Sequence, residues 1–184
     1  MPILRPEPTI FPESLLDEEE RSDDARRWRV LYTKSRQEKA LARDLLAATV
    51  PFYLPLIAKE NVMRGRRIAS YIPLFTGYMF LFGDEDERLR TLQTNRISRV
   101  LDVEDVGSLV HDLRQIQHLI ASGAPLTVES RLEPGNRVRV KHGSFAGLEG
   151  TVLQRRGKTR LLVAVNFLQQ GASVEVEDFF LEPI

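Results

Sequence analysis

The chain has 184 residues, of which 26 are basic and 26 acidic, so its formal net charge is zero. At about 150 residues per domain, this length accommodates one or two small domains and excludes a large multidomain enzyme. The sequence contains no cysteine, which excludes disulfides, thiolate metal sites and cysteine nucleophiles and is compatible with a reducing cytoplasm, where we expect the protein to act. No uncharged run reaches the roughly 18 apolar residues of a membrane span, so we expect no membrane contact.

The balanced total conceals an uneven distribution of charge. Residues 1–25 carry 2 basic and 8 acidic side chains, net −6, whereas residues 26–126 carry 16 and 11, net +5. Prolines and acidic side chains dominate residues 1–25, which predicts a disordered acidic tail that repels nonspecific polyanions. The cationic segment that follows is the candidate binding region for a polyanion such as nucleic acid.

Residues 26–121 combine strand-like and helical periodicity. Alternation at 28–33 predicts a strand, and Ser35 followed by Glu38 predicts a capping box that begins a helix running to about Thr49. The further elements expected, in chain order, are strands at 52–62 and 67–75 joined by a basic turn at 63–66, a strand at 77–82, a short helix beginning in the acidic run 84–87, a strand at 97–101 and a helix at 109–120. This order, β-α-β-β-β-α-β-α, predicts an α/β sandwich with a mainly antiparallel sheet.

The rest of the chain has a different pattern. Residues 122–133 lack a sustained period and are typical of a linker between domains. From 134 onward, glycine-bearing turns separate short strand candidates at 138–140, 151–154, 159–167 and 172–176, a spacing typical of a small all-β barrel. We therefore expect four regions, which are the tail 1–25, an α/β domain 26–121, a linker 122–133 and a β domain 134–184.

Three segments resemble a known family. The run Gly135-Asn-Arg-Val-Arg-Val-Lys-His-Gly-Ser-Phe-Ala-Gly-Leu-Glu-Gly-Thr-Val matches the KOW signature, although any SH3-like barrel would use such glycines. Trp28-Arg-Val-Leu-Tyr-Thr-Lys and Ile72-Pro-Leu-Phe-Thr-Gly-Tyr-Met-Phe-Leu resemble the amino-terminal (NGN) domain of the NusG family of transcription elongation factors. Together the resemblances cover residues 27–184 and imply an NGN-type α/β sandwich followed by a small all-β SH3-like KOW barrel.

The stretch Arg64-Gly-Arg-Arg and the short linker are most similar to specialised paralogues of this family, RfaH and the capsule-locus antiterminators. Thr76 departs from the family, which usually has proline at that point. The resemblance implies a monomeric, non-enzymatic elongation factor that binds RNA polymerase and suppresses pausing or termination. The alternative is a ribosome- or RNA-associated KOW protein without polymerase contact.

The resemblance also implies a dock for the clamp helices of the largest catalytic subunit of RNA polymerase. By position, the docking aromatics are Tyr32, Phe75, Tyr78 and Phe80, with Leu74 and Met79 in the core, while the gate loop of the polymerase would meet Arg88, Arg90 and Thr91. Exposed aromatic rings suit an interface because they bring large area with little rotamer loss. The alternative for each ring is burial in the domain's own sheet, since alternation sends one face of a strand into the core.

Cations are the candidate nucleic-acid contacts. The resemblance implies that the displaced non-template DNA strand is bound by Lys34, Arg36, Arg43 and Arg96, for which a solvated helix face is the alternative. Arg64, Arg66 and Arg67 at the hairpin tip are expected to approach upstream duplex DNA, although a charged turn also keeps an exposed hairpin soluble. In the KOW domain, Phe167 is the candidate contact for a second partner, a ribosomal protein or the termination factor Rho.

No pattern indicates chemistry. His111, His118 and His142 lack a third ligand at metal-site spacing, and no nucleophile-base constellation or phosphate loop is present, so we expect no enzyme activity, metal or cofactor. We also expect the KOW domain to be permanently β, because Val163, Val165 and Phe167 alternate in strand fashion. Each glycine of the region would cost about 1 kcal/mol inside a helix.

Overall fold

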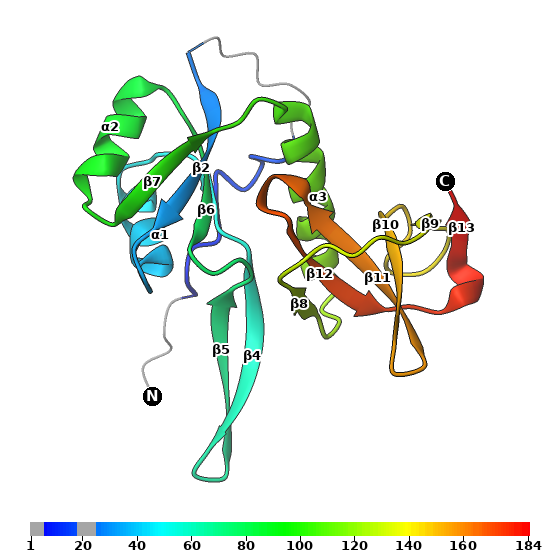
Figure 1. Cartoon of the computed structure of the whole chain (residues 1–184). Coiled ribbons are helices and arrows are strands. Elements are labelled where there is room, and N and C mark those ends of the chain that lie inside the picture. The colour runs from blue at the N-terminus through cyan, green and yellow to red at the C-terminus, as the bar shows by residue number, and fades with distance from the viewer. Residues whose placement is uncertain (1–5, 18–24) are drawn as a thin grey trace. The chain divides into compact units, whose positions relative to one another are not determined.

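The computed structural model describes residues 6–17 and 25–184. The chain divides into two units, Met1–Glu104 and Asp105–Ile184. Unit 1 combines helices with an antiparallel sheet, and unit 2 combines an antiparallel sheet with one long helix (Figure 1). The expected mixed α/β fold with mainly antiparallel sheets is therefore confirmed. Within the described ranges, no helix is long and apolar enough to cross a membrane.

The sheet of unit 1 has five strands in the order β1-β3-β6-β2-β7, and all of its pairings are antiparallel. The strands are β1 (Ile10–Phe11), β2 (Arg27–Thr33), β3 (Phe52–Tyr53), β6 (Tyr78–Gly83) and β7 (Ile97–Asp102). Helix α1 (Glu38–Ala47) packs Leu41 and Leu45 into an apolar cluster with Leu31, Met79 and Leu81 of the sheet. Burying such side chains contributes about 1.5–3 kcal/mol each, which fixes α1 to this face.

Strand β1 differs from the expected disordered tail. Ile10 and Phe11 pair with Tyr53 and Phe52, and the side chains of Leu15 and Leu16 are buried. The sequence did not predict this strand for two reasons. The composition of residues 1–25 is an average over the segment, in which the acidic residues outweigh these few apolar ones. The pairing with β3 is a tertiary contact, which local sequence does not show. The acidic residues 18–20 lie outside the described part of the chain.

Helix α1 also begins differently from the expected capping box. Arg36 has a φ of +60°, the helix starts only at Glu38, and its N-cap residue Gln37 makes no side-chain cap. The left-handed residue turns the chain between Ser35 and Glu38, so the spacing required for a reciprocal cap is lost. Glu38 is instead buried and bonds to another part of the domain, as described below.

Helix α2 (Glu85–Gln93) has the capping box that α1 lacks. The Asp84 carboxylate accepts the Glu87 N–H at 2.8 Å, and the Glu87 carboxylate accepts the Asp84 N–H at 2.8 Å. Acidic side chains in the first turn also favour the positive end of the helix dipole. The acidic run thus begins a helix as the sequence predicts.

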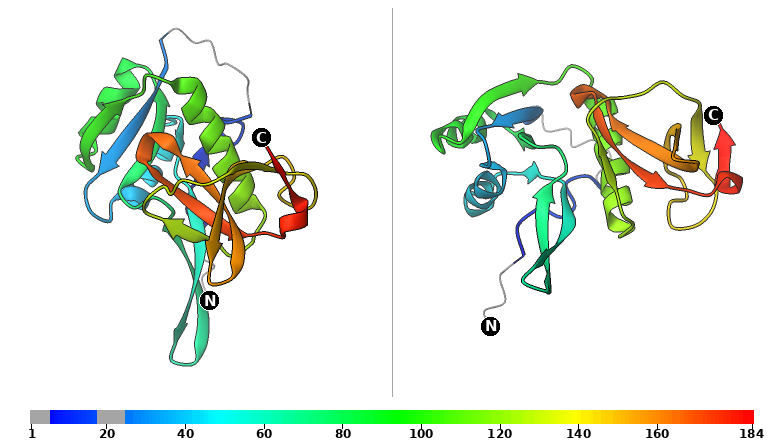
Figure 2. Two further views of the ribbon diagram at one scale, coloured as in Figure 1. Left: turned by 45° about the vertical axis from the view of Figure 1, so that its right-hand side comes forward. Right: turned by 60° about the horizontal axis from the view of Figure 1, so that its bottom comes forward.

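A two-stranded hairpin projects from unit 1 in each view (Figures 1 and 2). It consists of β4 (Leu56–Met63) and β5 (Arg66–Pro73), with Met63 opposite Arg66 at the closed end. The two turn residues, Arg64 and Gly65, have φ of +51° and +76°. Positive φ at both positions gives the turn the twist that suits a hairpin.

Unit 2 contains a six-stranded antiparallel sheet in the order β13-β9-β10-β11-β12-β8. Its strands are β8 (Thr127–Glu129), β9 (Arg137–Val140), β10 (Glu149–Arg155), β11 (Lys158–Val165), β12 (Gln170–Glu175) and β13 (Leu181–Pro183), with short 3-10 turns η1 (Asn166–Leu168) and η2 (Asp178–Phe180). Gly150 lies where β10 meets β11, and a Cβ there would overlap the carbonyl oxygen of Leu162. Close backbone approach therefore explains this glycine of the KOW signature.

Helix α3 (Val106–Ala121) groups with unit 2, which differs from the expected boundary at residue 121. It packs on β11, the Asp112 carboxylate accepts the Asn166 N–H at 3.0 Å, and the Gln115 amide donates to the Glu149 carbonyl at 3.0 Å. The expected linker also differs, because β8 within it pairs with β12. Sequence periodicity identified the helix but not the sheet against which it packs.

Candidate interaction surfaces

A pair of tyrosines marks one end of the central strands of unit 1. Tyr32 on β2 lies opposite Tyr78 on β6, and their ring centroids are 5.2 Å apart at an interplanar angle of 49°. Tyr32 is 41% exposed and Tyr78 is half-buried. The pair therefore offers aromatic surface to a partner while resting on the sheet.

The loop before β6 fixes this pair in place. Gly77 has a φ of +84°, and a Cβ on it would lie 3.0 Å from the Tyr32 ring. Its N–H donates to the buried Glu38 carboxylate at 2.7 Å, and its carbonyl accepts the Thr33 N–H at 2.8 Å. A charge-assisted bond inside a protein is stronger than a neutral one, so Glu38 anchors the loop to α1. Sequence reasoning missed this role because it assigned Glu38 to a local cap.

Two of the expected docking rings are buried, which corrects their assignment. Phe75 is 1% exposed and Phe80 is 0% exposed. Phe80 stacks on Tyr53 with centroids 6.4 Å apart, because β6 is flanked by β3 and β2 and both of its faces are covered. These rings belong to the core of unit 1, as do the buried Leu74 and Met79, which confirms the expected burial of the latter two.

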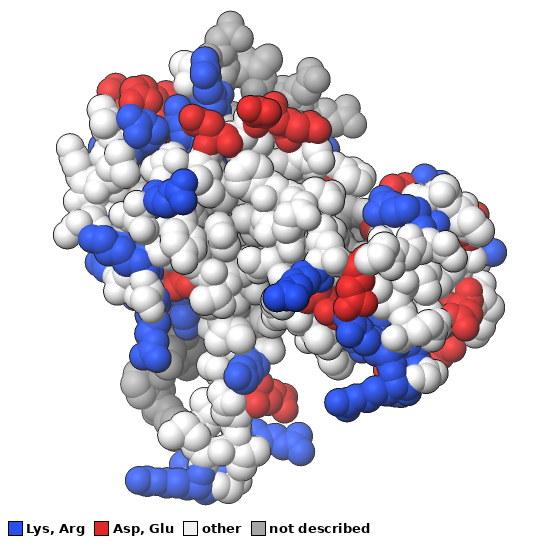
Figure 3. Space-filling view, viewed as in Figure 1, with Lys and Arg blue, Asp and Glu red and all other residues white. Residues whose placement is uncertain are grey.

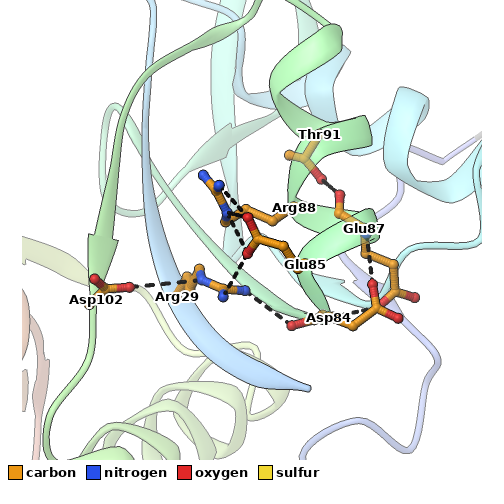
Figure 4. A network of polar contacts seen from close by, with 8 residues as sticks. Arg29, Asp84, Glu85, Glu87, Arg88, Thr91 and Asp102 are labelled. Atoms are coloured by element: carbon orange, nitrogen blue, oxygen red, sulfur yellow. Dashed lines mark hydrogen bonds and ion pairs between the residues drawn. The ribbon is translucent and has the colours of Figure 1, made fainter. Parts of the chain in front are cut away.

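Two of the three expected gate-loop residues on α2, Arg88 and Thr91, belong to a polar network (Figure 4). The Nε of Arg88 donates to both carboxylate oxygens of Glu85 at 2.9 and 3.0 Å, its Nη2 donates to Oε1, and this pairing lowers the pKa of the Glu85 carboxyl. Arg29 donates to the Gly83 carbonyl at 3.1 Å and lies 3.6 Å from Glu85. Thr91 is 1% exposed and its hydroxyl donates to the Glu87 carbonyl. Its expected contact with the gate loop is therefore corrected to a structural role within α2.

Arg90 of α2 differs from Thr91 because it is exposed. Its guanidinium donates to the carbonyl of Ala48 at 3.3 Å, at the end of α1. Of the three residues expected at the gate loop, Arg88 and Arg90 keep charged surface and Thr91 does not.

The expected non-template-strand cations are largely engaged within the chain. The Nη1 of Arg43 donates to both carboxylate oxygens of Glu7 at 2.7 Å, and Arg96 pairs with Asp44 at 2.6 Å. Lys34 donates to the side chain of Asn95 at 2.8 Å. Only Arg36 of these four residues is exposed without a hydrogen bond or ion pair to the described residues. The four cations are therefore not equally available to a phosphate.

The hairpin cations are available. Arg64, Arg66 and Arg67 are exposed, and none of them forms an ion pair within residues 6–17 and 25–184. Figure 3 shows Lys and Arg side chains gathered at the free end of this hairpin. The end of this hairpin thus gathers three exposed cations that have no ion-pair partner among the described residues.

In unit 2, Phe167 lies in η1, directly after β11, and is 38% exposed. Asp112 of α3 holds the preceding residue Asn166, and burial raises the pKa of the Asp112 carboxyl. The sequence missed a second aromatic surface, where Phe179 is 68% exposed and stacks on Phe180 at a centroid distance of 4.3 Å. In the sequence, this surface could have been found from the dipeptide Phe179-Phe180, which follows the acidic pair Glu177-Asp178.

The three histidines of unit 2 are exposed. His118 lies 3.2 Å from the Ser144 carbonyl, and His142 packs edge-on to Phe180. Among the described residues, no three His, Asp or Glu side chains gather closely enough to hold a metal ion.

Unit 1 displays a tyrosine pair and a basic hairpin, and unit 2 displays exposed aromatic side chains of its own, which are features typical of proteins that bind macromolecular partners. A family model described as "Transcription termination factor nusG" matches residues 26–131, more than half of the chain. The chain therefore belongs to the NusG family, whose members are transcription factors that bind RNA polymerase.

One solved structure to which the chain is similar is titled "Crystal Structure of MjSpt4:Spt5 complex conformation B". The two chains are 12% identical with a TM-score of 0.28, and the match covers 85% of this chain and 96% of that one. A TM-score this low supports no conclusion about fold or function.

Proposed function

We propose that this chain is a non-enzymatic transcription elongation factor that docks on the clamp helices of the largest catalytic subunit of RNA polymerase through Tyr32 and Tyr78. The observation that carries the proposal is the tyrosine pair, in which Tyr32 is exposed and Tyr78 half-buried, held by the Gly77 loop and its bond to Glu38. Pre-ordered aromatic rings lose little conformational entropy on binding and dominate interface energies. The exposed Arg90 and the paired Arg88 extend this dock toward the polymerase gate loop.

The proposed consequence of docking is suppression of pausing and termination. A ligand shifts an equilibrium only by its difference in affinity for the two states. The factor must therefore bind the elongating conformation of polymerase more tightly than the paused one, and a hundredfold preference corresponds to about 2.7 kcal/mol.

Nucleic acid and a second protein complete the proposal. Arg36 is the leading contact for the non-template strand, because the other three cations are already hydrogen-bonded or paired within the chain. Unit 2 is proposed as the SH3-like KOW barrel, with Phe167 contacting a ribosomal protein or the termination factor Rho. The unpaired arginines of the hairpin support assignment to the specialised, RfaH-like branch of the family.

The dock is tested by capture of RNA polymerase with the full-length chain carrying Tyr32→Ala or Tyr78→Ala. We expect each variant to weaken binding by about 2 kcal/mol, roughly thirtyfold, with an unchanged melting temperature. Phe179→Ala, an exposed aromatic of unit 2, is the matched control and should bind normally. Normal capture by both tyrosine variants would exclude this dock, and no capture by the parent chain would favour an RNA- or ribosome-associated role.

The direction of regulation is tested separately by transcription in vitro across a pause site and an intrinsic terminator. We expect the protein to increase read-through at both. Increased termination would contradict the proposed antitermination while leaving the dock intact.

A further inference from the structure

We propose that the free part of the β4–β5 hairpin, residues 58–69, is a β-ribbon that enters the major groove of duplex DNA and contacts base edges. The inference rests on the proposed function and on the expectation from the sequence that the hairpin arginines approach upstream duplex DNA. It goes further in assigning the groove, the face of the ribbon and the side chains that meet the bases.

The hairpin is anchored at its root and free beyond it. Leu56 is buried, the Leu74 N–H donates to the Pro55 carbonyl at 2.9 Å, and Lys39 of α1 donates to the Tyr71 carbonyl at 2.7 Å. From residue 58 to residue 69 every position is exposed. An isolated two-stranded hairpin has little stability of its own, so this projection indicates a surface that is completed by a ligand.

Charge identifies the ligand as a polyanion. Residues 58–69 carry four cations, Lys59, Arg64, Arg66 and Arg67, and one carboxylate, Glu60, which gives a net charge of +3. None of the four cations forms an ion pair with any residue that the structure describes. Elsewhere in unit 1, Arg29, Arg43, Arg88 and Arg96 all have carboxylate partners. Unpaired cations on a projecting ribbon suit a phosphate backbone, which supplies the missing anions.

The strand register separates the hairpin into two chemically different faces. Met63 pairs with Arg66, Asn61 with Ile68 and Lys59 with Ser70, and paired residues share a face. The opposite face carries Glu60. Its carboxylate would be repelled by phosphates and by the hydrogen-bond acceptors of the bases. The face with Lys59, Asn61, Met63, Arg66 and Ile68, here called the groove face, is therefore the one that approaches DNA.

The groove face carries the side-chain types that distinguish bases. Arginine pairs in bidentate fashion with O6 and N7 of guanine, and asparagine with N6 and N7 of adenine. The exposed apolar side chains Met63 and Ile68, 61% and 46% exposed, suit the methyl group of thymine. A solubilising turn would need only the cations and would leave these apolar groups unexplained.

The dimensions agree with the major groove. Two paired strands lie about 5 Å apart, and the major groove, about 12 Å wide, admits such a ribbon with its side chains. Successive residues on one face are about 6.8 Å apart, close to the rise of two base pairs. Asn61 and Met63 thus fall opposite bases about two steps apart.

The test is selection of 20-base-pair DNA duplexes with a randomised centre by the full-length protein, followed by affinity measurements and guanine N7 methylation interference. We expect a preferred sequence that contains guanine and adenine, and interference at the preferred guanine. Asn61→Ala should relax the preference at one position about tenfold, and Arg66→Gln should remove the interference. Arg67→Gln on the opposite face should weaken all duplexes equally.

The second hairpin of the chain supplies a matched control. Arg156 and Gly157 between β10 and β11 have φ of +54° and +76°, nearly the values of Arg64 and Gly65. Arg64→Gln should weaken duplex binding and lower the salt slope by about 0.9, whereas Arg156→Gln should do neither. Equal effects of the two variants would overturn the proposal.

Other outcomes also decide the question. Duplex binding without sequence preference or N7 interference, or preference for single-stranded DNA or for RNA, would overturn the major-groove assignment. Loss of polymerase capture with duplex selection retained would refute the proposed dock alone. Retained capture without any duplex binding would refute the ribbon alone.

Discussion

The hairpins β4–β5 and β10–β11 close with the same Arg-Gly turn in nearly the same conformation, yet their surroundings differ. In β10–β11, Arg155 pairs with Glu129 and Glu133 at 3.3 and 2.7 Å, and Lys158 pairs with Glu175 at 3.0 Å. Its strands also continue into a six-stranded sheet. Among the described residues, no carboxylate forms an ion pair with a cation of the β4–β5 hairpin, and no third strand joins its two-stranded sheet. Turn sequence therefore determines local geometry, whereas the availability of a tip to a partner depends on tertiary neighbours.

The largest expected difference between the two hairpins is the loss of stability when a glycine is replaced by alanine. Gly150→Ala should place a methyl group against the Leu162 carbonyl and destabilise unit 2 by about 3 kcal/mol or more, because backbone atoms of paired strands cannot move aside. Gly65→Ala has open space and should cost about 1 kcal/mol through its positive φ alone. Denaturant unfolding of the full-length protein measures both, and similar losses would contradict the contrast.

Removing two carboxylates beside β10–β11 should make the DNA affinities of the two hairpin tips more alike. Glu129→Gln combined with Glu133→Gln removes the carboxylates that hold Arg155, so the β10–β11 tip should gain affinity for duplex DNA at low salt. Each newly available cation should steepen the salt slope by about 0.9. The conservative variant Glu129→Asp with Glu133→Asp keeps the charges and should bind as the parent does. An unchanged slope in the glutamine variant would show that internal pairing does not limit this tip.

The pH dependence of unit 2 should depend on Asp112. Burial raises the pKa of its carboxyl in the folded protein, although the Asn166 bonds, His111 and Arg137 oppose the shift. The folded state thus binds this proton more tightly than the unfolded state, so the contribution of Asp112 to stability falls as pH rises from 3.8 through the raised pKa. Asp112→Asn keeps an acceptor for Asn166 and should remove this fall. Unfolding curves across that range compare the two proteins, and parallel curves would contradict the assignment.

The smallest expected effect is a gain in stability on replacing the first turn residue of each hairpin. Asparagine tolerates positive φ better than arginine, so Arg64→Asn and Arg156→Asn should each stabilise the protein by a few tenths of a kcal/mol. Thermal unfolding compares the two, with Arg64→Lys as the control that retains charge without easing the backbone. A larger gain in β4–β5 than in β10–β11 would indicate that the free hairpin already frays.

Most elements could be predicted from the sequence because periodicity is local. The helix that became α3 and the strands β2, β6 and β7 lie close to their expected bounds. The errors concern partners distant in sequence. Glu38 accepts a hydrogen bond from Gly77, thirty-nine residues away, and does not form the predicted local cap. Arg43 pairs with Glu7 of the expected tail. Alternation showed that β6 has two faces but could not show that both are covered at Phe80.

Strand β1 determines how one edge of the unit 1 sheet is closed. An open antiparallel sheet presents unpaired backbone groups along its edge strands, and long edges recruit other chains into aggregates. Here the segment next to β3 has only two strand residues, with Pro8 and Pro12 close on either side. Proline has no N–H to offer a neighbouring strand. The amino-terminal residues thus form the border of the sheet on this side, and a recombinant fragment starting at residue 26 would leave the outer backbone groups of Phe52 and Tyr53 in β3 without these partners.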